Sequence, residues 1–512
     1  MKALKKYRWP LTGALLGVLV FLAVSGVRVL DPTSVDWILN SLSPDPIQHY
    51  LGWELFRRSP VHLPYIGANY NAVYPFRTSV LFTDSLPLAA LFFKLLGGIL
   101  PTRFQYFGWW GLLCYAMQGG LAQAVIARIA GVQPTFGRDD TRKAAIIMSP
   151  GQTAKLWCSV LGAGVLVLFP ALTIRMFAHT ALAANWLVLL ALYLWLRSDE
   201  LMPTTRRACL IWGSMGLLCA GIHLYYLPMV GLVLVGYAVR RALQKRGPAA
   251  VLAPIAAFCA AALAELVLLG AFAGNFAGYS NGYLSGADYL GLFVPWLAQS
   301  WEQNVYAGVG TSLAVVLAVF GIVCNARKAE KFFAAHRDWL IAGAVVLVLD
   351  LIAAGGNAIT VNGKTLFTVP IPQFLMNFWA MFSSCARLAW LAGMLLAAVG
   401  CGLVLRFWDN GVAPALMLAV CAVAQGWGQR SELFNRWTDY HYYGFRYENK
   451  TLLTDPVWEQ VAASGRPLPH LTLSMTSSGI WSTLPPTTAG RRTASTWRTW
   501  TATLRRSRCR AS

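Results

Sequence analysis

The chain has 512 residues, of which 57% are hydrophobic and only 12% are charged. Apolar runs close to the length of a membrane-spanning helix, about 20 residues, recur along it, which indicates an all-α polytopic transmembrane bundle. The net charge is +21, but the basic residues form short clusters between apolar runs, as in the cytoplasmic loops of membrane proteins. Nucleic acid is therefore excluded as an expected partner, whereas membrane lipids are expected.

The first apolar run, residues 11–30, follows a basic segment. It is long for a secretory signal and lacks a clear small-x-small cleavage site, so we expect an uncleaved first span. The run from Cys209 to Val239 would be about 45 Å long as one helix, so we expect two short spans joined by a turn at GIHLYYLP. The other runs expected to cross are 106–128, 156–174, 179–196, 249–272, 308–324, 338–355, 388–407 and 411–427.

The segment TSVLFTDSLPLAALFFKLLGGILP, residues 78–101, decides the topology. If it does not cross, the basic clusters around Arg142, Arg207, Lys245 and Lys331 share the side of the N-terminal lysines, as the positive-inside rule requires. We therefore expect an interfacial or re-entrant helix on the outer face. This gives about eleven spans, a cytoplasmic N-terminus and a periplasmic C-terminus.

Polar residues then collect on the outer face. This face comprises the first outer loop (31–105), the turn from Arg175 to His179, the turn at His223, the loop 274–308 and the segment 356–387.

Several motifs carry a resemblance to a known family. DPIQHYLGWELFR, TDSLPLAALFFKLL, RFQYFGWWGLL, HTALAANWLVLLALYL and IHLYYLPM together resemble an uncharacterised bacterial multi-pass membrane family that is itself similar to GT-C glycosyltransferases. A first span, a large outer loop with an acidic residue near its start and an interfacial helix are also similar to GT-C enzymes. The resemblance covers about residues 30–430.

The resemblance implies a GT-C-like domain at residues 1–430 in the bacterial inner membrane. It also implies transfer of a sugar from a polyprenyl-phosphate carrier to an acceptor on the periplasmic face, with an acidic residue of the first outer loop at the reaction centre. Asp45 matches that residue. A lipid phosphate leaves readily once its charge is neutralised, whereas the acceptor hydroxyl needs a carboxylate to take or orient its proton.

The residues of the first outer loop also have structural interpretations. DPIQ predicts a helix with Asp45 as N-cap, Pro46 at the first helical position and Gln48 closing a capping box. His49 lies on the same helical face and would bind phosphate or a metal, or be a solvated interfacial residue. Asp84 is either a second outer carboxylate or the cap of SLPLAALFFKLL. No third ligand is evident, so no metal site is assigned, and a divalent metal stays open.

Four further residues are candidates for substrate binding. Arg175 and His179 bracket an outer turn, where they would meet a lipid phosphate or anchor the chain at the headgroups. His223, beside two tyrosines, has the same two interpretations. Arg387 lies on the outer side against the usual charge bias, which favours function. Glu265 and Asp350 fall within apolar runs, where interhelical hydrogen bonding explains them, so they are not assigned to the site.

The C-terminal part changes in composition. Residues 431–465 begin an outer C-terminal region, and residues 466–512 are rich in Arg, Ser and Thr. This tail is expected to be disordered, or to arise from a change of reading frame near GRPLPHLTLSMTSSG.

A transporter or lipid-linked-sugar flippase, and a catalytically inactive family member, are the alternative functions. A transporter would favour inverted repeats and charges at the membrane midplane, and no clear repeat is evident.

Overall fold

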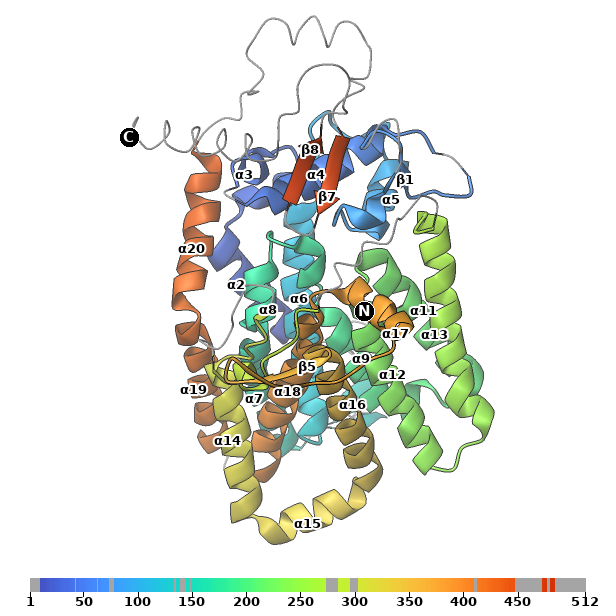
Figure 1. Cartoon of the computed structure of the whole chain (residues 1–512). Helices are drawn as coiled ribbons and strands as arrows, with labels where there is room; N and C mark the ends of the chain where they lie inside the picture. The colour runs from blue at the N-terminus through green and yellow to red at the C-terminus, as the bar shows by residue number, and fades with distance from the viewer. Residues whose placement is uncertain are drawn as a thin grey trace, which may run out of the picture.

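The computed structural model is mostly helical, and Figure 1 shows a bundle of long helices with a layer of short helices across one end. It describes residues 10–41, 43–61, 63–72, 78–132, 135–138, 144–147, 149–272, 284–294, 303–408, 412–446, 472–476 and 479–483. The long helices are α2 (Pro10–Ser25), α6 (Phe107–Ile129), α7 (Pro150–Val167), α9 (Trp186–Leu196), α11 (Thr205–Ile222), α12 (Tyr226–Leu243), α13 (Pro248–Leu269), α14 (Val309–Cys324), α16 (Arg337–Gly355), α18 (Trp390–Phe407) and α19 (Val412–Gly428). Helix therefore covers most of every run that was expected to cross.

Fewer of these helices are, taken singly, long and apolar enough to cross a membrane. Among the described residues these are α6, α12, α13, α16 and the continuous helix Cys385–Phe407, 5 in all. Two bent pairs, Val309–Cys324 with Ala326–Ala335 at 104° and Val412–Gly428 with Arg430–Phe445 at 64°, raise the number to 7 if each pair is one span. The protein is thus a helical bundle with five to seven candidate membrane-spanning helices.

The outward faces of the bundle are apolar. Leu252 and Leu263 of α13, Val316 of α14, Ile352 of α16 and Val423 of α19 are each more than half exposed. Soluble monomers rarely expose large contiguous apolar patches, because water penalises them. The distribution is typical of helices that face lipid.

Small residues let the first helix approach the bundle closely. An added Cβ at Gly13 would lie 2.3 Å from the backbone oxygen of Gly119, and one at Gly119 would lie 2.0 Å from the oxygen of Gly13. Gly17 repeats the approach one turn later, with 1.9 Å to the oxygen of Tyr115. This small-x-x-x-small pattern is the usual means by which membrane helices gain backbone contact.

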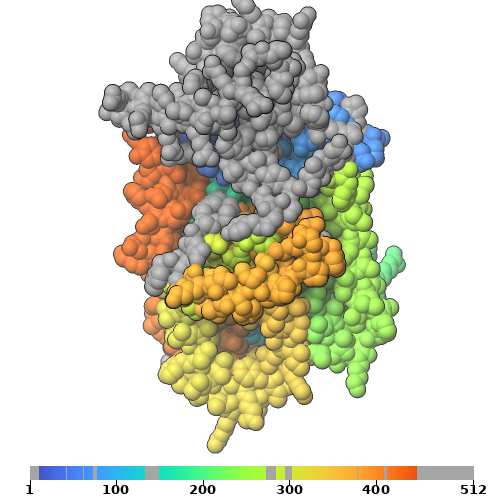
Figure 2. Space-filling view, in the orientation of Figure 1, coloured from blue at the N-terminus to red at the C-terminus, as the bar shows by residue number. Residues whose placement is uncertain are grey.

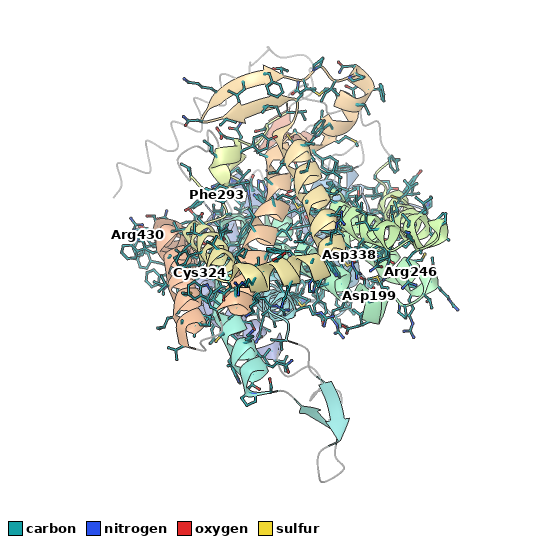
Figure 3. The ribbon with its side chains drawn as sticks, turned by 90° about the horizontal axis from the view of Figure 1, so that it is seen from below. Asp199, Arg246, Phe293, Cys324, Asp338 and Arg430 are labelled. Atoms are coloured by element: carbon teal, nitrogen blue, oxygen red, sulfur yellow. The ribbon has the colours of Figure 1, made fainter. Side chains whose placement is uncertain are left out.

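Ion pairs join several helix ends at one end of the bundle. Arg128, at the end of α6, lies 2.6 Å from Glu200, and Arg240, at the end of α12, lies 2.7 Å from Asp199 and 2.9 Å from Asp338. Figure 3 looks onto this end, where Asp199 and Asp338 lie near each other. The basic clusters that these residues represent thus share one side, as the sequence predicts. Which side of a membrane it faces stays a prediction.

The opposite end carries the layer of short elements. It contains η1 (Arg28–Leu30), α3 (Asp36–Leu39), α4 (Pro44–Arg58), β1 (Ala68–Asn69), β2 (Thr78–Ser79), η2 (Val80–Phe82) and α5 (Pro87–Leu95). Helix α5 has 9 residues, about 14 Å of helix, which is too short for a crossing of about 30 Å. The segment around Asp84 therefore does not span, in agreement with the interfacial helix that the sequence predicts.

The remaining elements connect or cover the bundle. They are β3 (Thr135–Arg138), β4 (Ala144–Ile147), α8 (Pro170–Arg175), η3 (Thr180–Ala183), α10 (Ser198–Leu201), η4 (Tyr289–Leu292), α15 (Ala326–Ala335), β5 (Ala358–Val361), β6 (Lys364–Thr368), α17 (Gln373–Trp379), η7 (Ala380–Phe382), η8 (Cys385–Ala389), α20 (Arg430–His441) and η9 (Tyr443–Phe445). Figure 2 shows the segment from β6 to α17 as an orange band across one face, next to the yellow α14–α16. Leu366, Phe367 and Phe374 on this band are exposed, which suits contact with the apolar edge of a membrane.

Two short strands are described in the C-terminal tail. Strands β7 (Thr472–Thr476) and β8 (Gly479–Thr483) pair as an antiparallel hairpin, and β8 lies against α4. The sequence TLSMT–GIWST places β-branched and apolar residues in both strands, which favours pairing even in a polar environment. The expectation of disorder for residues 466–512 stays a prediction, because most of that tail lies outside the described residues.

Candidate functional site

The site begins with helix α4, whose buried face carries His49. His49, Trp53 and Phe56 lie on one face of the helix and are all buried, because positions four and seven residues apart share a face. Ser43, not Asp45, is the N-cap: its Oγ accepts a hydrogen bond from the backbone N–H of Asp45. Pro44 starts the helix, so the predicted capping box with Pro46 and Gln48 is wrong. The serine two residues before Asp45 provides the cap.

Asp45 therefore does not cap helix α4. It lies in the first turn of α4, where its Oδ2 accepts a hydrogen bond from Ser43 Oγ at 3.3 Å. A carboxylate in the first turn is favoured by the helix dipole. Its side chain is 24% exposed, so it can meet a substrate.

Asp84 comes from the loop that connects η2 to α5. This loop packs closely on α4, since an added Cβ at Gly52 would lie 2.5 Å from Thr83 Cβ and 2.6 Å from Ser85 Oγ. Ser85 Oγ also donates a hydrogen bond to the backbone oxygen of His49 at 2.8 Å. Asp84 itself has a φ of +51°, an uncommon conformation for a residue other than glycine. The N-cap of α5 is Leu86, so the capping role predicted for Asp84 is wrong.

Two more histidines of the site lie in turns between helices. His179 lies between α8 and η3, and its backbone N–H donates to the backbone oxygen of Arg175 at 2.9 Å. His223 occupies the turn between α11 and α12, where the sequence predicts one. Both turns lie at the end of the bundle that carries α4 and α5.

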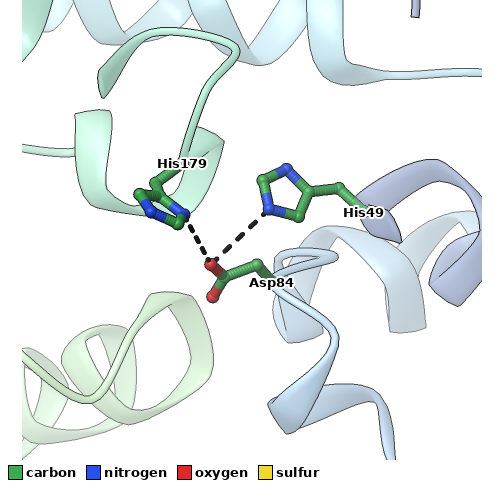
Figure 4. Close-up of side chains that lie close together, drawn as sticks. All are labelled: His49, Asp84 and His179. Atoms are coloured by element: carbon green, nitrogen blue, oxygen red, sulfur yellow. Dashed lines mark ion pairs between the residues drawn. The ribbon is translucent and has the colours of Figure 1, made fainter. Parts of the chain in front are cut away.

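These residues meet around the carboxylate of Asp84, as Figure 4 shows for His49 and His179. Asp84 Oδ2 lies 3.6 Å from His49 Nε2 and 3.5 Å from His179 Nδ1. Asp84 Oδ1 lies 3.2 Å from His223 Nε2. The other nitrogen of His179, Nε2, lies 3.9 Å from Asp45 Oδ2. Five residues from four separate segments thus form one cluster.

The outer ring nitrogens have partners of their own. His223 Nδ1 accepts the backbone N–H of Tyr225 at 3.2 Å, so its Nε2 carries the proton and donates toward Asp84. His49 Nδ1 lies 3.5 Å from Thr180 Oγ1. Each imidazole is therefore held in a defined orientation.

The cluster is partly open to solvent and strongly polarised. His49 is 2% exposed, whereas the side chains of Asp84, His179 and His223 are 23%, 18% and 15% exposed. Burial raises the pKa of Asp84, but the favourable electrostatic interaction with His223 and the contacts with the rings of His179 and His49 outweigh it and lower that pKa well below 3.8. Asp84 is thus an anion at physiological pH.

One buried arginine, Arg387, contacts this cluster through Tyr225, and a second, Arg175, lies four residues before His179. Arg387 is 8% exposed, and its Cζ lies 5.1 Å from the ring of Tyr225, which in turn stacks on His223 with ring centroids 5.5 Å apart. Arg175 is 1% exposed, and its Cζ lies 5.5 Å from the ring of Trp390 at the start of α18. Arg387 is thus a cation beside the aromatic and imidazole part of the site, which is a suitable arrangement for anionic ligands.

The cluster brings together five of the residues singled out from the sequence: Asp45, His49, Asp84, His179 and His223. The structure places His179 close to His49 and Asp84, a grouping that the sequence does not reveal because about a hundred residues or more separate them. Sequence reasoning missed Ser43 and Thr180. Both are hydroxyl residues beside an assigned candidate, which is the signal that could have found them.

Asp350 and Glu265, the two acidic residues within apolar runs, have no described contact with this cluster. Asp350 is fully buried in α16, and its Oδ2 accepts the backbone N–H of Ala392 of α18 at 2.9 Å. This is the interhelical hydrogen bond that the sequence favours. Glu265 lies in α13, and only 17% of the apolar part of this helix is buried inside the bundle.

Comparison with known proteins places the chain in a family. The family described as "Domain of unknown function (DUF6311)" matches residues 14–430. No curated protein and no solved structure matches the chain. These comparisons do not link it to GT-C glycosyltransferases, so that resemblance stays a prediction. The match spans the whole helical bundle and every residue of the cluster, and on this basis the chain belongs to the DUF6311 family.

Proposed function

We propose that this protein is a GT-C-like membrane glycosyltransferase that moves a sugar from a polyprenyl-phosphate donor to an acceptor on the periplasmic face. The observation that carries the proposal is the cluster of two carboxylates and three histidines at one end of an apolar bundle, with buried Arg387 beside it and buried Arg175 four residues before His179. Such a site combines a proton acceptor with cations for a phosphate, and it lies where a lipid headgroup would be.

Asp45 is the proposed proton acceptor. In the reaction, the acceptor oxygen forms a bond to the anomeric carbon of the sugar while the bond from that carbon to the phosphate oxygen breaks. The bonding electrons leave with the phosphate, and the hydroxyl proton passes to a carboxylate oxygen of Asp45. Asp45 suits this role better than Asp84, because Asp84 faces three imidazoles while Asp45 accepts only one described hydrogen bond from a side chain, that of Ser43.

Arg387 and Arg175 are the proposed phosphate ligands. The polyprenyl phosphate gains negative charge as it leaves, and fixed cations at that position lower the barrier most when they are shielded from water. Both arginines are buried, and guanidinium groups bind phosphate oxygens in pairs. His223 joins Arg387 to the carboxylates through the ring of Tyr225.

The proposal includes the topology. Eleven segments would cross, α9 together with η3 as the apolar helix Thr180–Leu196, with the cluster on the periplasmic side and the ion-paired end in the cytoplasm. The basic residues Arg128 and Arg240 at that end support this orientation. The lipid-exposed apolar faces of α13 and α14 support a membrane location.

A comparison of cell-surface glycans tests the proposal. Glycans from cells with and without the gene would be released and weighed by mass spectrometry. The expected result is that the deletion removes one sugar residue from a defined glycan and that the wild-type gene restores it. Identical glycan masses in both strains would contradict glycosyl transfer. Build-up of the complete donor on the cytoplasmic leaflet would instead favour the flippase alternative.

A further inference from the structure

The three residues nearest the centre of the cluster have the chemistry of a metal site. His49 Nε2, His179 Nδ1 and one oxygen of Asp84 lie within 4.8 Å of one another. Two imidazoles and a carboxylate are the ligand set of many catalytic zinc centres and of other first-row metal sites. Mg²⁺ and Ca²⁺ prefer oxygen ligands alone, so the donor set discriminates against them.

The separations fit an ion better than they fit direct hydrogen bonds. Asp84 Oδ2 lies 3.6 Å from His49 Nε2 and 3.5 Å from His179 Nδ1, whereas N–H···O hydrogen bonds have heavy-atom distances of about 2.7–3.2 Å. Two ligand atoms bound about 2.0–2.2 Å from one tetrahedral ion lie about 3.3–3.6 Å apart. The two distances that involve the Asp84 carboxylate therefore already match the separation between two ligand atoms of one ion. The third distance, between the two imidazole nitrogens, is at most 4.8 Å.

The surroundings supply the outer partners that metal ligands require. A ligating imidazole binds through one nitrogen while its other N–H is held by an oxygen. The nearest such oxygen is Thr180 Oγ1 for His49, at 3.5 Å from Nδ1, and Asp45 Oδ2 for His179, at 3.9 Å from Nε2. Both separations exceed a hydrogen bond and would shorten when an ion orders the two rings. The carboxylate also has an outer partner, because His223 Nε2 faces the oxygen that is not directed at the other two histidines. All three ligands thus have an outer contact.

We propose that His49, Asp84 and His179 bind one divalent first-row transition-metal ion, with zinc as the best match, and that His223, Thr180 and Asp45 orient the three ligands. Three protein ligands leave at least one coordination position for water or for an oxygen of a phosphate. That second role of the ion rests on the proposed function, whereas its binding does not. His223 is a positioning residue, because its Nδ1 accepts the Tyr225 N–H and its Nε2 is therefore protonated.

Metal analysis of the full-length protein tests the site directly. The protein would carry a Strep-tag in place of a polyhistidine tag, be purified in detergent, stripped with EDTA and reloaded separately with Zn²⁺, Mn²⁺, Co²⁺ or Mg²⁺. Wild-type protein is expected to hold about one transition-metal ion per chain by mass spectrometry. In the Co²⁺ form, visible absorption should indicate nitrogen and oxygen ligands. Less than a tenth of an ion per chain, or retention of Mg²⁺ alone, would overturn the site.

Variants separate the site from adventitious binding. Asp84→Asn keeps the size of the side chain and should reduce the metal content at least tenfold, and His179→Ala should do the same from a partly exposed position. His336→Ala is the matched control, since His336 lies at the junction of α15 and α16, at the other end of the bundle. Unchanged metal content in both site variants would overturn the assignment.

The outcomes also separate this inference from the proposed function. Stoichiometric zinc in a protein whose deletion leaves surface glycans unchanged would overturn the glycosyltransferase and leave the metal site intact. Glycan loss on deletion, in a protein without bound metal, would overturn only the metal site.

Discussion

His223 donates to one oxygen of Asp84, and a backbone contact determines which nitrogen of the His223 ring is the donor. Its Nε2 lies 3.2 Å from Asp84 Oδ1, while its Nδ1 accepts the N–H of Tyr225, also at 3.2 Å. The backbone donor fixes the tautomer, and the ring then donates to the carboxylate. Asp84 Oδ2 is left directed toward His49 and His179, so His223 determines which oxygen faces the proposed ion.

Removal of this outer contact should weaken the metal site without abolishing it. His223→Ala is expected to lower zinc affinity about 10- to 100-fold, the usual effect of losing an outer partner. His223→Gln should recover part of the affinity, because its amide N–H₂ can donate to the same oxygen. The measurement is competition with a chromophoric chelator. Loss of all metal from His223→Ala would make it a ligand, and unchanged affinity would remove its positioning role.

Substitutions at Asp45 and Ser43 separate chemistry from capping. Asp45→Asn should reduce sugar transfer by about 10²–10⁴-fold, because the amide cannot take the proton of the acceptor. Membrane insertion should be unchanged, and most of the metal content should remain, because the asparagine oxygen can still face His179 Nε2. Ser43→Ala removes the helix cap, which costs about 0.5–2 kcal/mol of stability, and should retain transfer.

Glycan analysis and thermal unfolding in detergent measure the two effects. Wild-type transfer by Asp45→Asn would exclude Asp45 as the proton acceptor, and Asp84→Asn would be the next variant to compare.

Arg387 should act on the donor phosphate. Arg387→Ala is expected to lower kcat/KM for the lipid-linked donor by about 10- to 100-fold, since hydrogen bonds to charged groups contribute about 1.5–3 kcal/mol. Arg387→Lys should give an intermediate value, because lysine keeps the charge but loses the paired donors. Arg430→Ala, in α20, is the control. An equal loss for Ala and Lys, with normal donor binding, would argue for a structural role through Tyr225.

The orientation of the bundle can be measured with topology reporters. Fusions after Arg207, Lys245 and Lys331 should report the cytoplasm, and fusions after Tyr65 and Ser285 should report the periplasm, because the basic ends of α12 and α16 lie together. Alkaline phosphatase and fluorescent-protein activities provide the measurement. The reverse pattern would put the metal cluster in the cytoplasm and contradict the proposed donor.

The ion pairs at the basic end should make stability depend on pH. Burial raises the pKa of Asp199, but hydrogen bonds and positive charge from Arg240 and Arg241 outweigh it and lower that pKa below 3.8. Since the folded pKa is below that of the unfolded chain, about 3.9, the stabilisation is complete above that value and is lost as the pH falls below it.

Asp199→Asn tests this dependence. At pH 7 it should cost about 1 kcal/mol, a modest value because Asp199 is 53% exposed and solvent screens the pair. Wild type and variant should converge in melting temperature as the pH falls below about 4. Glu330→Gln, on the exposed side of α15, is the control. A difference that persists at low pH would contradict a charge-based effect.

The sequence by itself determined the helical bundle, the turn at His223 and the short helix after Asp84. Those features depend on local apolar length and on breakers such as Pro87, which act over a few residues. Charge bias along the chain also predicted that Arg128 and Arg240 lie at the same end. Local pattern failed at Asp45, where Ser43 competes for the same cap.

Only the tertiary structure decided the cluster. His179 and His223 follow His49 by more than a hundred residues, and no periodicity connects positions on different helices. Their meeting depends on packing: Gly52 admits the loop of Asp84 against α4, and the helix ends of α8, α11 and α12 are fixed by the bundle beneath. Which imidazole nitrogen faces Asp84 depends in turn on backbone and hydroxyl partners, such as Tyr225 and Thr180, that become neighbours only in the folded chain.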